Sequence, residues 1–236
     1  MLTKNGYTIY SYDHTGCRKS EGKNSVGLAQ SLNDLDHALN AIESLPEYKN
    51  CKISVVGHSW GGFAALNIPK LHPELDSVVA ISGFLGVEAM ARQLFPPIIA
   101  GYRKTIVGYE KQNNPVYALF DARDSLKDTK VRTLVIHSSD DKTVRCAYHF
   151  DVLQKALSDN KNISFIKTHG KGHHPYYTEA AIAEFDKMMK ATKRAVNKKL
   201  LKTSDDCIKF RDSLNWEKIT EQDEEFWNTV FNHIGK

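Results

Sequence analysis

Short apolar runs along the chain alternate with longer segments whose apolar residues recur at helical spacing. Five of these runs are predicted strands: Gly6–Tyr12, Lys52–Val56, Ser77–Ser82, Val131–His137 and Ile163–Lys167. The segment after the first run is a predicted helix from Ser31 to about Leu45, with an apolar face formed by Leu32, Leu35, Ala38, Leu39 and Ile42. Strands that alternate with helices are typical of an α/β fold built on a mostly parallel sheet.

Polar residues mark the expected ends of the helices. Ser31 and Asp34 have the spacing of a capping box. Ala180–Met189 is predicted to be the helix that closes the domain, and Thr220 is the expected cap of a last helix over Glu221–Ile234. Basic residues crowd the segment 187–202, which we interpret as a solvated helical face, with attraction to an anionic surface as the alternative. No aromatic residues are interleaved with them that would favour nucleic acid.

The composition is that of an ordinary globular protein. Its 32 Lys and Arg against 28 Asp and Glu give a net charge of +4, too mild a balance to predict a nucleic-acid partner. The four cysteines are scattered without a C-x-x-C pair, so we expect free thiols in a reducing compartment, although the sequence leaves pairing open. No signal peptide or apolar run of membrane-spanning length is present, which predicts a cytoplasmic protein without a membrane segment.

The stretch Gly57-His58-Ser59-Trp60-Gly61-Gly62 lies between an apolar run and a predicted helix. In that setting a G-x-S-x-G pattern indicates a very tight turn that lifts a serine hydroxyl clear of the backbone. We expect Gly57 and Gly61 to remove Cβ atoms that would collide as strand and helix pack together. Ser59 is therefore the candidate nucleophile. The alternative is a glycine-rich turn with an incidental serine.

A serine nucleophile needs a base, and the base needs a carboxylate that orients it. In a sheet of this kind the acid follows the serine along the chain, and the histidine follows the acid. Asp140 and Asp141 lie in the polar loop after the fourth predicted strand, and the D-x-x-V spacing to Val144 favours Asp141 as the acid. Asp140 is expected to cap the turn or face solvent, the usual role of both residues in an Asp-Asp pair.

Three histidines follow the last predicted strand in a glycine-rich loop. His173 is the predicted base, because Gly172 before it lets the loop approach the serine. His174 is the second choice, since the following proline favours an extended backbone there, and His169 is the third. No acidic or cysteine ligand lies at a metal-like spacing from these histidines, and H-E-x-x-H is absent, so no metal and no other cofactor is expected.

With Ser59, Asp141 and His173, the chain resembles the α/β-hydrolase family, near its serine aminopeptidase, lysophospholipase and esterase members. The segment Asp13-His14-Thr15-Gly16-Cys17-Arg18-Lys19-Ser20 is similar to the family's D-x-x-G-x-G-x-S loop, with Arg18 where a second glycine is usual. The resemblance extends from Asn5 to about Glu184. It implies a helical lid at 83–130 within one domain over residues 1–236, whereas the helical C-terminal extension expected at 190–236 follows from the residues themselves.

The resemblance also implies an α/β-hydrolase fold that is truncated at its N-terminus. Relatives have further strands before Gly6–Tyr12, and one of them would lie between that strand and Lys52–Val56. Its His-Gly type loop supplies a second donor to the oxyanion hole. In this chain we therefore expect the Trp60 backbone N–H as one donor and the second donor to be missing.

These residues predict a serine hydrolase that cleaves a carboxylic ester or thioester of a small or acyl-chain substrate through an acyl-enzyme. The alternatives are an aminopeptidase or amidase, or a catalytically weak fragment that acts as a binding protein. Glu88 and Glu110 are candidates to bind a peptide amino terminus. The sequence does not specify substrate identity or oligomeric state.

Overall fold

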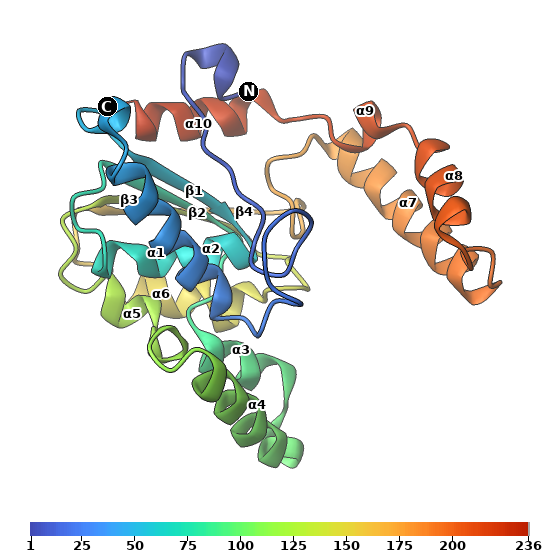
Figure 1. Cartoon of the computed structure of the whole chain (residues 1–236), viewed down its shortest axis with the longest axis horizontal. Helices are drawn as coiled ribbons and strands as arrows, with labels where there is room; N and C mark the ends of the chain where they lie inside the picture. Colours follow the sequence, from blue (N-terminus) through green and yellow to red (C-terminus); the bar gives the residue numbers. More distant parts are fainter. Residues whose placement is uncertain (236) are drawn as a thin grey trace.

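The structure is a computed structural model that describes residues 1–235, and it is built on a parallel β-sheet (Figure 1). Within those residues the sheet contains four strands in the order β1-β2-β3-β4, each parallel to its neighbour. The strands are β1 (Ser54–His58), β2 (Ser77–Ile81), β3 (Arg132–Ser138) and β4 (Ile163–Thr168). Because the strands run in one direction, their carboxyl ends and the loops that follow them lie along a single edge.

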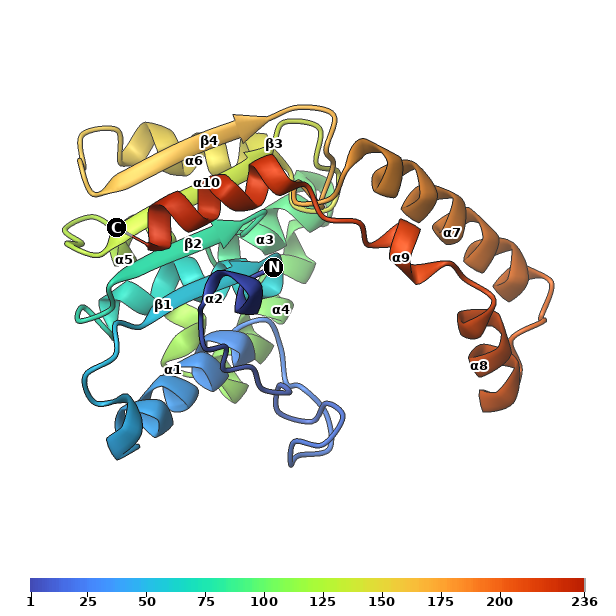
Figure 2. The ribbon, with the colours of Figure 1, turned by 90° about the horizontal axis from the view of Figure 1, so that it is seen from above.

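Helices cover both faces of the sheet, with α10 on one face and α1, α2 and α6 on the other (Figures 1 and 2). The helices are α1 (Gln30–Glu43), α2 (Trp60–Asn67), α3 (Val87–Leu94), α4 (Ala100–Asn113), α5 (Ala122–Ser125), α6 (Phe150–Ala156), α7 (Glu179–Asn197), α8 (Ser204–Asp212), α9 (Trp216–Ile219) and α10 (Glu224–Ile234).

Alternate side chains of β2 enter two different cores, as the two-residue period of a strand requires. Val78 and Ala80 pack with α1, α2 and α6 in the larger core. Val79 and Ile81 pack in the second core against residues of α10, including Val230. All five residues of β2 are buried, which is typical of a strand inside a parallel sheet.

The expected strand at Gly6–Tyr12 is not present. Residues 8–12 make no backbone hydrogen bond to any other residue within the described range 1–235. A cavity of about 1050 Å³ is lined both by this segment and by β1, so the two do not pair across it. β1 is consequently an edge strand, and within residues 1–235 the sheet contains only the other four predicted strands.

The prediction for the closing helix is also wrong. Helix α7, which contains Ala180–Met189, extends away from the sheet together with α8 and α9 (Figure 2). Helix α10 closes the domain instead, since its apolar side chains pack on β2 and β3. It begins at Glu224 with the side chain of Asp223 as its cap, so the expected cap at Thr220 is wrong as well.

The connection from residue 83 to residue 130 is largely helical and contains α3, α4 and α5. The beginning of this connection contributes to the larger core through Phe84, Leu85 and Met90. By contrast, Ile98, between α3 and α4, is 92% exposed. All four cysteines are free of disulfides. Among residues 1–235, no helix has both the length and the apolar character that crossing a bilayer requires.

Candidate active site

Ser59 stands in the tight turn between β1 and α2. Its φ of +56° lies in the left-handed region, a conformation that costs about 1–3 kcal/mol for a residue other than glycine. The backbone N–H of Ser59 donates to the carbonyl oxygen of Ile81 at 2.9 Å, which ties the turn to β2. The surrounding fold therefore holds the partly buried serine in the strained position that a nucleophile elbow requires.

Two glycines let the backbone pack closely around this turn, and one of them differs from the prediction. A Cβ on Gly57 would overlap with the carbonyl group of Gly61, as expected. A Cβ on Gly61 itself would meet nothing within 4 Å, so the expectation for Gly61 is wrong. The second close approach is at Gly62, where a Cβ would lie 2.7 Å from the Cα of Gly83.

Ser59, His173 and Asp141 form one chain of hydrogen bonds. The Nε2 atom of His173 lies 2.8 Å from the Ser59 hydroxyl oxygen, and its Nδ1 atom lies 2.7 Å from Oδ2 of Asp141. The three residues come from the ends of β1, β3 and β4, which meet at the carboxyl edge of the sheet. The arrangement has the donor and acceptor order of a serine, a base and an orienting acid.

The Asp141 side chain is completely buried, and its environment favours the charged form. Its Oδ1 atom accepts the backbone N–H groups of Thr143 at 2.8 Å and Val144 at 3.0 Å. Burial alone would raise the pKa of Asp141, but hydrogen bonds from His137 and His173 outweigh burial and lower it well below the ordinary value. The carboxylate is therefore ionised at neutral pH, with its Oδ2 atom 2.7 Å from Nδ1 of His173.

The neighbouring Asp140 caps the loop, one of the two roles expected for it. Its Oδ1 atom accepts the backbone N–H groups of Gly170 at 2.9 Å and Gly172 at 3.3 Å, which fixes the loop that carries His173. His169 lies outside this arrangement, with Nδ1 at 2.8 Å from the hydroxyl of Ser139. Of the two adjacent aspartates, only Asp141 contacts the imidazole.

His58 and Tyr176 also contact the site, and the sequence analysis assigned them no role. Nε2 of His58 lies 2.7 Å from the backbone carbonyl of His173, and its Nδ1 lies 3.4 Å from the Tyr176 hydroxyl. Burial, and after it the neighbouring histidines, lower the pKa of His58 to about 4. The ring is therefore neutral at pH 7, and its Nε2–H donates to the His173 carbonyl. The sequence signal for this contact is the histidine directly before the nucleophile.

The backbone N–H of Trp60 is the first of helix α2, and it has no hydrogen-bond acceptor within residues 1–235. The first amides of a helix have no partner in their own helix, so they are available to an anion. The side chain of Trp60 is fixed by a 2.6 Å hydrogen bond from its indole Nε1 to the carbonyl of Leu28. The expectation that Trp60 supplies one oxyanion donor fits this geometry.

The loop that resembles the family's D-x-x-G segment is tied to α1 by Asp34. Its carboxylate accepts from Nδ1 of His14 at 2.9 Å and from the Thr15 hydroxyl at 2.6 Å, and the His14 ring lies 4.5 Å from the Trp60 ring. Burial opposes ionisation of Asp34, but these hydrogen bonds outweigh it and lower its pKa to about 2. Asp34 thus anchors this loop and does not form a capping box with Ser31. The capping-box prediction is therefore wrong.

The two glutamates considered for binding a peptide amino terminus already have other partners. Glu110 is buried, and its carboxylate accepts the backbone N–H groups of Leu28 at 2.6 Å and Ala29 at 3.1 Å, just before α1. Glu88 pairs with Arg92 at 2.6 Å. The Glu110 carboxylate therefore takes the place that the capping box assigned to Asp34, as the acidic group at the start of α1.

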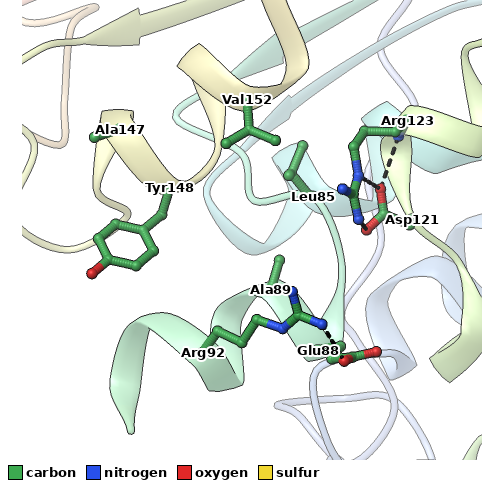
Figure 3. Close-up of a pocket in the computed structure, with 9 residues that line it drawn as sticks. All are labelled: Leu85, Glu88, Ala89, Arg92, Asp121, Arg123, Ala147, Tyr148 and Val152. Atoms are coloured by element: carbon green, nitrogen blue, oxygen red, sulfur yellow. Dashed lines mark hydrogen bonds and ion pairs between the residues drawn. The ribbon is translucent and has the colours of Figure 1, made fainter. Parts of the chain in front are cut away.

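A smaller pocket of about 240 Å³ lies between α3, the turn at residues 121–123 and the segment 147–152 (Figure 3). Two arginines line it, and each faces its own carboxylate: Arg92 pairs with Glu88, and Arg123 pairs with Asp121 at 2.8 Å. The lining includes no member of the hydrogen-bonded chain from Ser59 to Asp141. Since both guanidinium charges are paired, we assign no ligand to this pocket.

The comparisons with known proteins concern the fold and the type of family that the chain resembles. Residues 1–112 match the family model described as serine aminopeptidase, S33. No curated protein matches the sequence. An esterase of Pyrococcus furiosus is similar in two crystal forms, with 18% identity and TM-scores of 0.53 and 0.54 over 71% and 72% of this chain. The chain covers 63% and 64% of those structures, which is less than two thirds of their length.

Est1E from Butyrivibrio proteoclasticus, whose structure holds ferulic acid, is also similar. It has a TM-score of 0.51 and 18% identity, with 68% of this chain and 67% of that chain covered. At this level of identity the solved structures show the fold. The fold is that of the α/β-hydrolases, and the match to the family model covers residues 1–112, a little under half of the chain.

Proposed function

We propose that this chain is a serine hydrolase that cleaves a carboxylic ester or thioester through an acyl-enzyme. The observation that carries the proposal is the unbroken hydrogen-bonded chain from the Ser59 hydroxyl through both nitrogens of His173 to Asp141. The strained backbone of Ser59 is independent support, because such a conformation is retained where a site needs it.

The proposed reaction has two halves that use the same groups. Ser59 Oγ attacks the substrate carbonyl carbon while Nε2 of His173 accepts the hydroxyl proton, and the carbonyl oxygen becomes an oxyanion facing the Trp60 amide. When the tetrahedral intermediate collapses, the protonated His173 gives that proton to the leaving alcohol or thiol. Water then attacks the acyl-enzyme with His173 as base, which releases the acid and restores Ser59.

The charges around His173 suit a base that becomes cationic during the reaction. Asp141 carries a negative charge 2.7 Å from Nδ1, which stabilises the imidazolium as it forms. The His58 ring lies 4.8 Å from the His173 ring and donates a hydrogen bond to the His173 backbone carbonyl, but it is neutral at pH 7, so it adds no competing positive charge. The proton therefore has one favourable route, between Ser59 and His173.

An ester substrate has more support than a peptide. The similar Pyrococcus furiosus structures are of an esterase. The match to a serine aminopeptidase model favours an aminopeptidase or amidase as the second candidate. However, Glu88 and Glu110, which could bind a substrate amino terminus, are already engaged by Arg92 and by the amides before α1. We therefore propose a small-molecule ester or acyl substrate.

The oxyanion hole that we propose includes the Trp60 amide as a donor. Removal of a single donor lowers turnover by about 10²–10³ where it has been tested.

A fluorophosphonate probe tests the proposal directly, because it labels a serine only where a base activates it. Ser59→Ala should abolish labelling of the full 236-residue chain. Ser139→Ala is the matched control, since its hydroxyl also lies 2.8 Å from a histidine nitrogen, on His169, but outside the chain that includes Asp141. Undiminished labelling of Ser59→Ala, or loss of labelling in Ser139→Ala, would refute the assignment. Hydrolysis of p-nitrophenyl esters beside aminoacyl p-nitroanilides then separates the two substrate classes.

A further inference from the structure

A second cluster of ionisable side chains lies at the opposite end of the sheet from Ser59. Its centre is His72, in the turn that leads into β2, and the cluster also contains Glu74 from that turn and Glu43, the last residue of α1. The His72 ring is buried, with 5% of its side chain exposed. Nothing in the proposed hydrolysis uses these residues.

Carboxylates contact both nitrogens of the His72 ring. Nε2 lies 2.8 Å from Oδ1 of Asp36. Nδ1 lies 2.8 Å from Oε1 of Glu74 and 3.5 Å from Oε1 of Glu43. Three carboxylates therefore converge on one imidazole, and two of them approach the same nitrogen.

The charges in this cluster do not balance. Even a fully protonated His72 supplies one positive charge against three carboxylates. Within residues 1–235, none of the three carboxylates forms an ion pair with a lysine or arginine. A bound cation would offset this excess of negative charge.

We propose that Nδ1 of His72 and one carboxylate oxygen each from Glu43 and Glu74 bind a Zn²⁺ ion. These three donor atoms lie within 4.8 Å of one another. Zinc bonds of about 2.0–2.2 Å to nitrogen and oxygen bring such donors together with small side-chain movements. Glu43 and Glu74 are 39% and 53% exposed, so an ion can enter from solvent, and water completes the coordination.

The groups behind His72 have the arrangement of an outer coordination shell. Asp36 accepts from Nε2, which leaves Nδ1 as the nitrogen that faces the two glutamates. The second oxygen of Asp36 accepts the Tyr117 hydroxyl at 2.6 Å, so the carboxylate is itself held in place. A carboxylate on the far nitrogen of a ligating histidine fixes the ring orientation and makes it a better ligand. An imidazole among carboxylates favours zinc over magnesium or calcium, which prefer oxygen ligands alone.

A zinc ion here would join the end of α1 to the turn before β2. These two segments are separated along the chain by β1 and α2. The predicted effect is on stability and not on chemistry at Ser59, because the site lies at the amino ends of the strands. Binding to the folded state alone raises the melting temperature in proportion to the logarithm of the free zinc concentration.

The test is calorimetric titration of chelator-treated full chain with ZnCl₂, together with its melting temperature with and without zinc. We expect one zinc per chain and a higher melting temperature, and no comparable effect of MgCl₂ or CaCl₂. The double variant Glu43→Gln/Glu74→Gln should lose this binding. It changes only partly exposed side chains, so it avoids the folding risk of replacing the buried His72. Glu47→Gln, at an exposed glutamate near the end of α1, is the matched control and should bind zinc as wild type does.

Two further variants separate the site from its alternatives. Tyr117→Phe removes only the hydroxyl behind Asp36 and should weaken zinc binding about 10–100-fold. His173→Gln should leave zinc binding unchanged, because that histidine belongs to the catalytic arrangement. The proposal is overturned if wild type binds no zinc at millimolar concentration, if the double variant binds as wild type does, or if His173→Gln abolishes the binding.

Discussion

Replacing Asp141 with asparagine is the most direct test of how the proposed catalytic residues work together. An asparagine at position 141 can still accept the Thr143 and Val144 amides through its Oδ1 atom. Its amide nitrogen would replace Oδ2, 2.7 Å from Nδ1 of His173. Because that nitrogen is a donor, Nδ1 must become an acceptor, and the imidazole proton moves to Nε2.

The consequence appears at the nucleophile. Nε2 lies 2.8 Å from Oγ of Ser59, and once protonated it cannot accept the serine proton. A wrong tautomer of this kind lowers turnover about 10⁴-fold in a comparable triad. At about 1.36 kcal/mol for each factor of ten, this corresponds to about 5.4 kcal/mol of lost transition-state stabilisation.

The assay compares kcat/KM on a p-nitrophenyl ester and the rate of fluorophosphonate labelling between wild type and Asp141→Asn. Asp140→Asn is the control, since that carboxylate accepts loop amides without touching the imidazole. Weakening those hydrogen bonds should reduce activity about tenfold or less. Circular dichroism must show that both variants are folded. The reasoning fails if folded Asp141→Asn keeps more than a tenth of wild-type activity, or if the two variants lose activity equally.

Three other predictions concern the fold around the site. Gly57→Ala should lower the free energy of unfolding by about 1–3 kcal/mol or more in urea denaturation, because the new Cβ overlaps the Gly61 carbonyl. Gly61→Ala is the control, because a Cβ at that position meets no other atom within 4 Å. An equal loss of stability in both variants would contradict the explanation. Asp34→Asn should lower the free energy of unfolding by about 2 kcal/mol at pH 6. The difference from wild type should shrink as the pH falls from about 4 to 2, because a carboxyl group with a lowered pKa contributes its full stability only above its pKa in the unfolded chain. A difference that does not change with pH would contradict this explanation. The Val55 amide points toward β2, whereas the Val56 amide points away from it. In hydrogen exchange, the Val56 amide should therefore exchange faster than the Val55 amide. Equal protection of the two amides would mean that the outer edge of β1 is paired.

The sequence predicts the chemistry of the site better than the arrangement of the chain around it. Ser59, Asp141 and His173 each follow a strand, and local patterns identify the strand, the turn and the polar residue together. The structure brings these three side chains within hydrogen-bonding distance. Their catalytic roles stay a prediction until the variants above are measured.

What the sequence misses depends on contacts between distant segments. Gly6–Tyr12 has the alternating composition of a strand, but a strand forms only where another strand pairs with it, and local pattern does not report its partner. The capping box before α1 fails for the same reason, since Glu110, about eighty residues away, supplies the anion instead. His58 was identified only as part of a motif, because its contact is with the backbone of His173.

The unpaired edge of β1 has a consequence for handling the protein. Along a parallel strand the backbone groups of alternate residues point to opposite sides, so those of Ser54, Val56 and His58 point away from β2. Bare main-chain donors and acceptors of this kind can recruit the edge of another molecule, and natural sheets usually shield them. Concentrated solutions of this chain should therefore self-associate through intermolecular sheet extension, and light scattering should rise steeply with protein concentration.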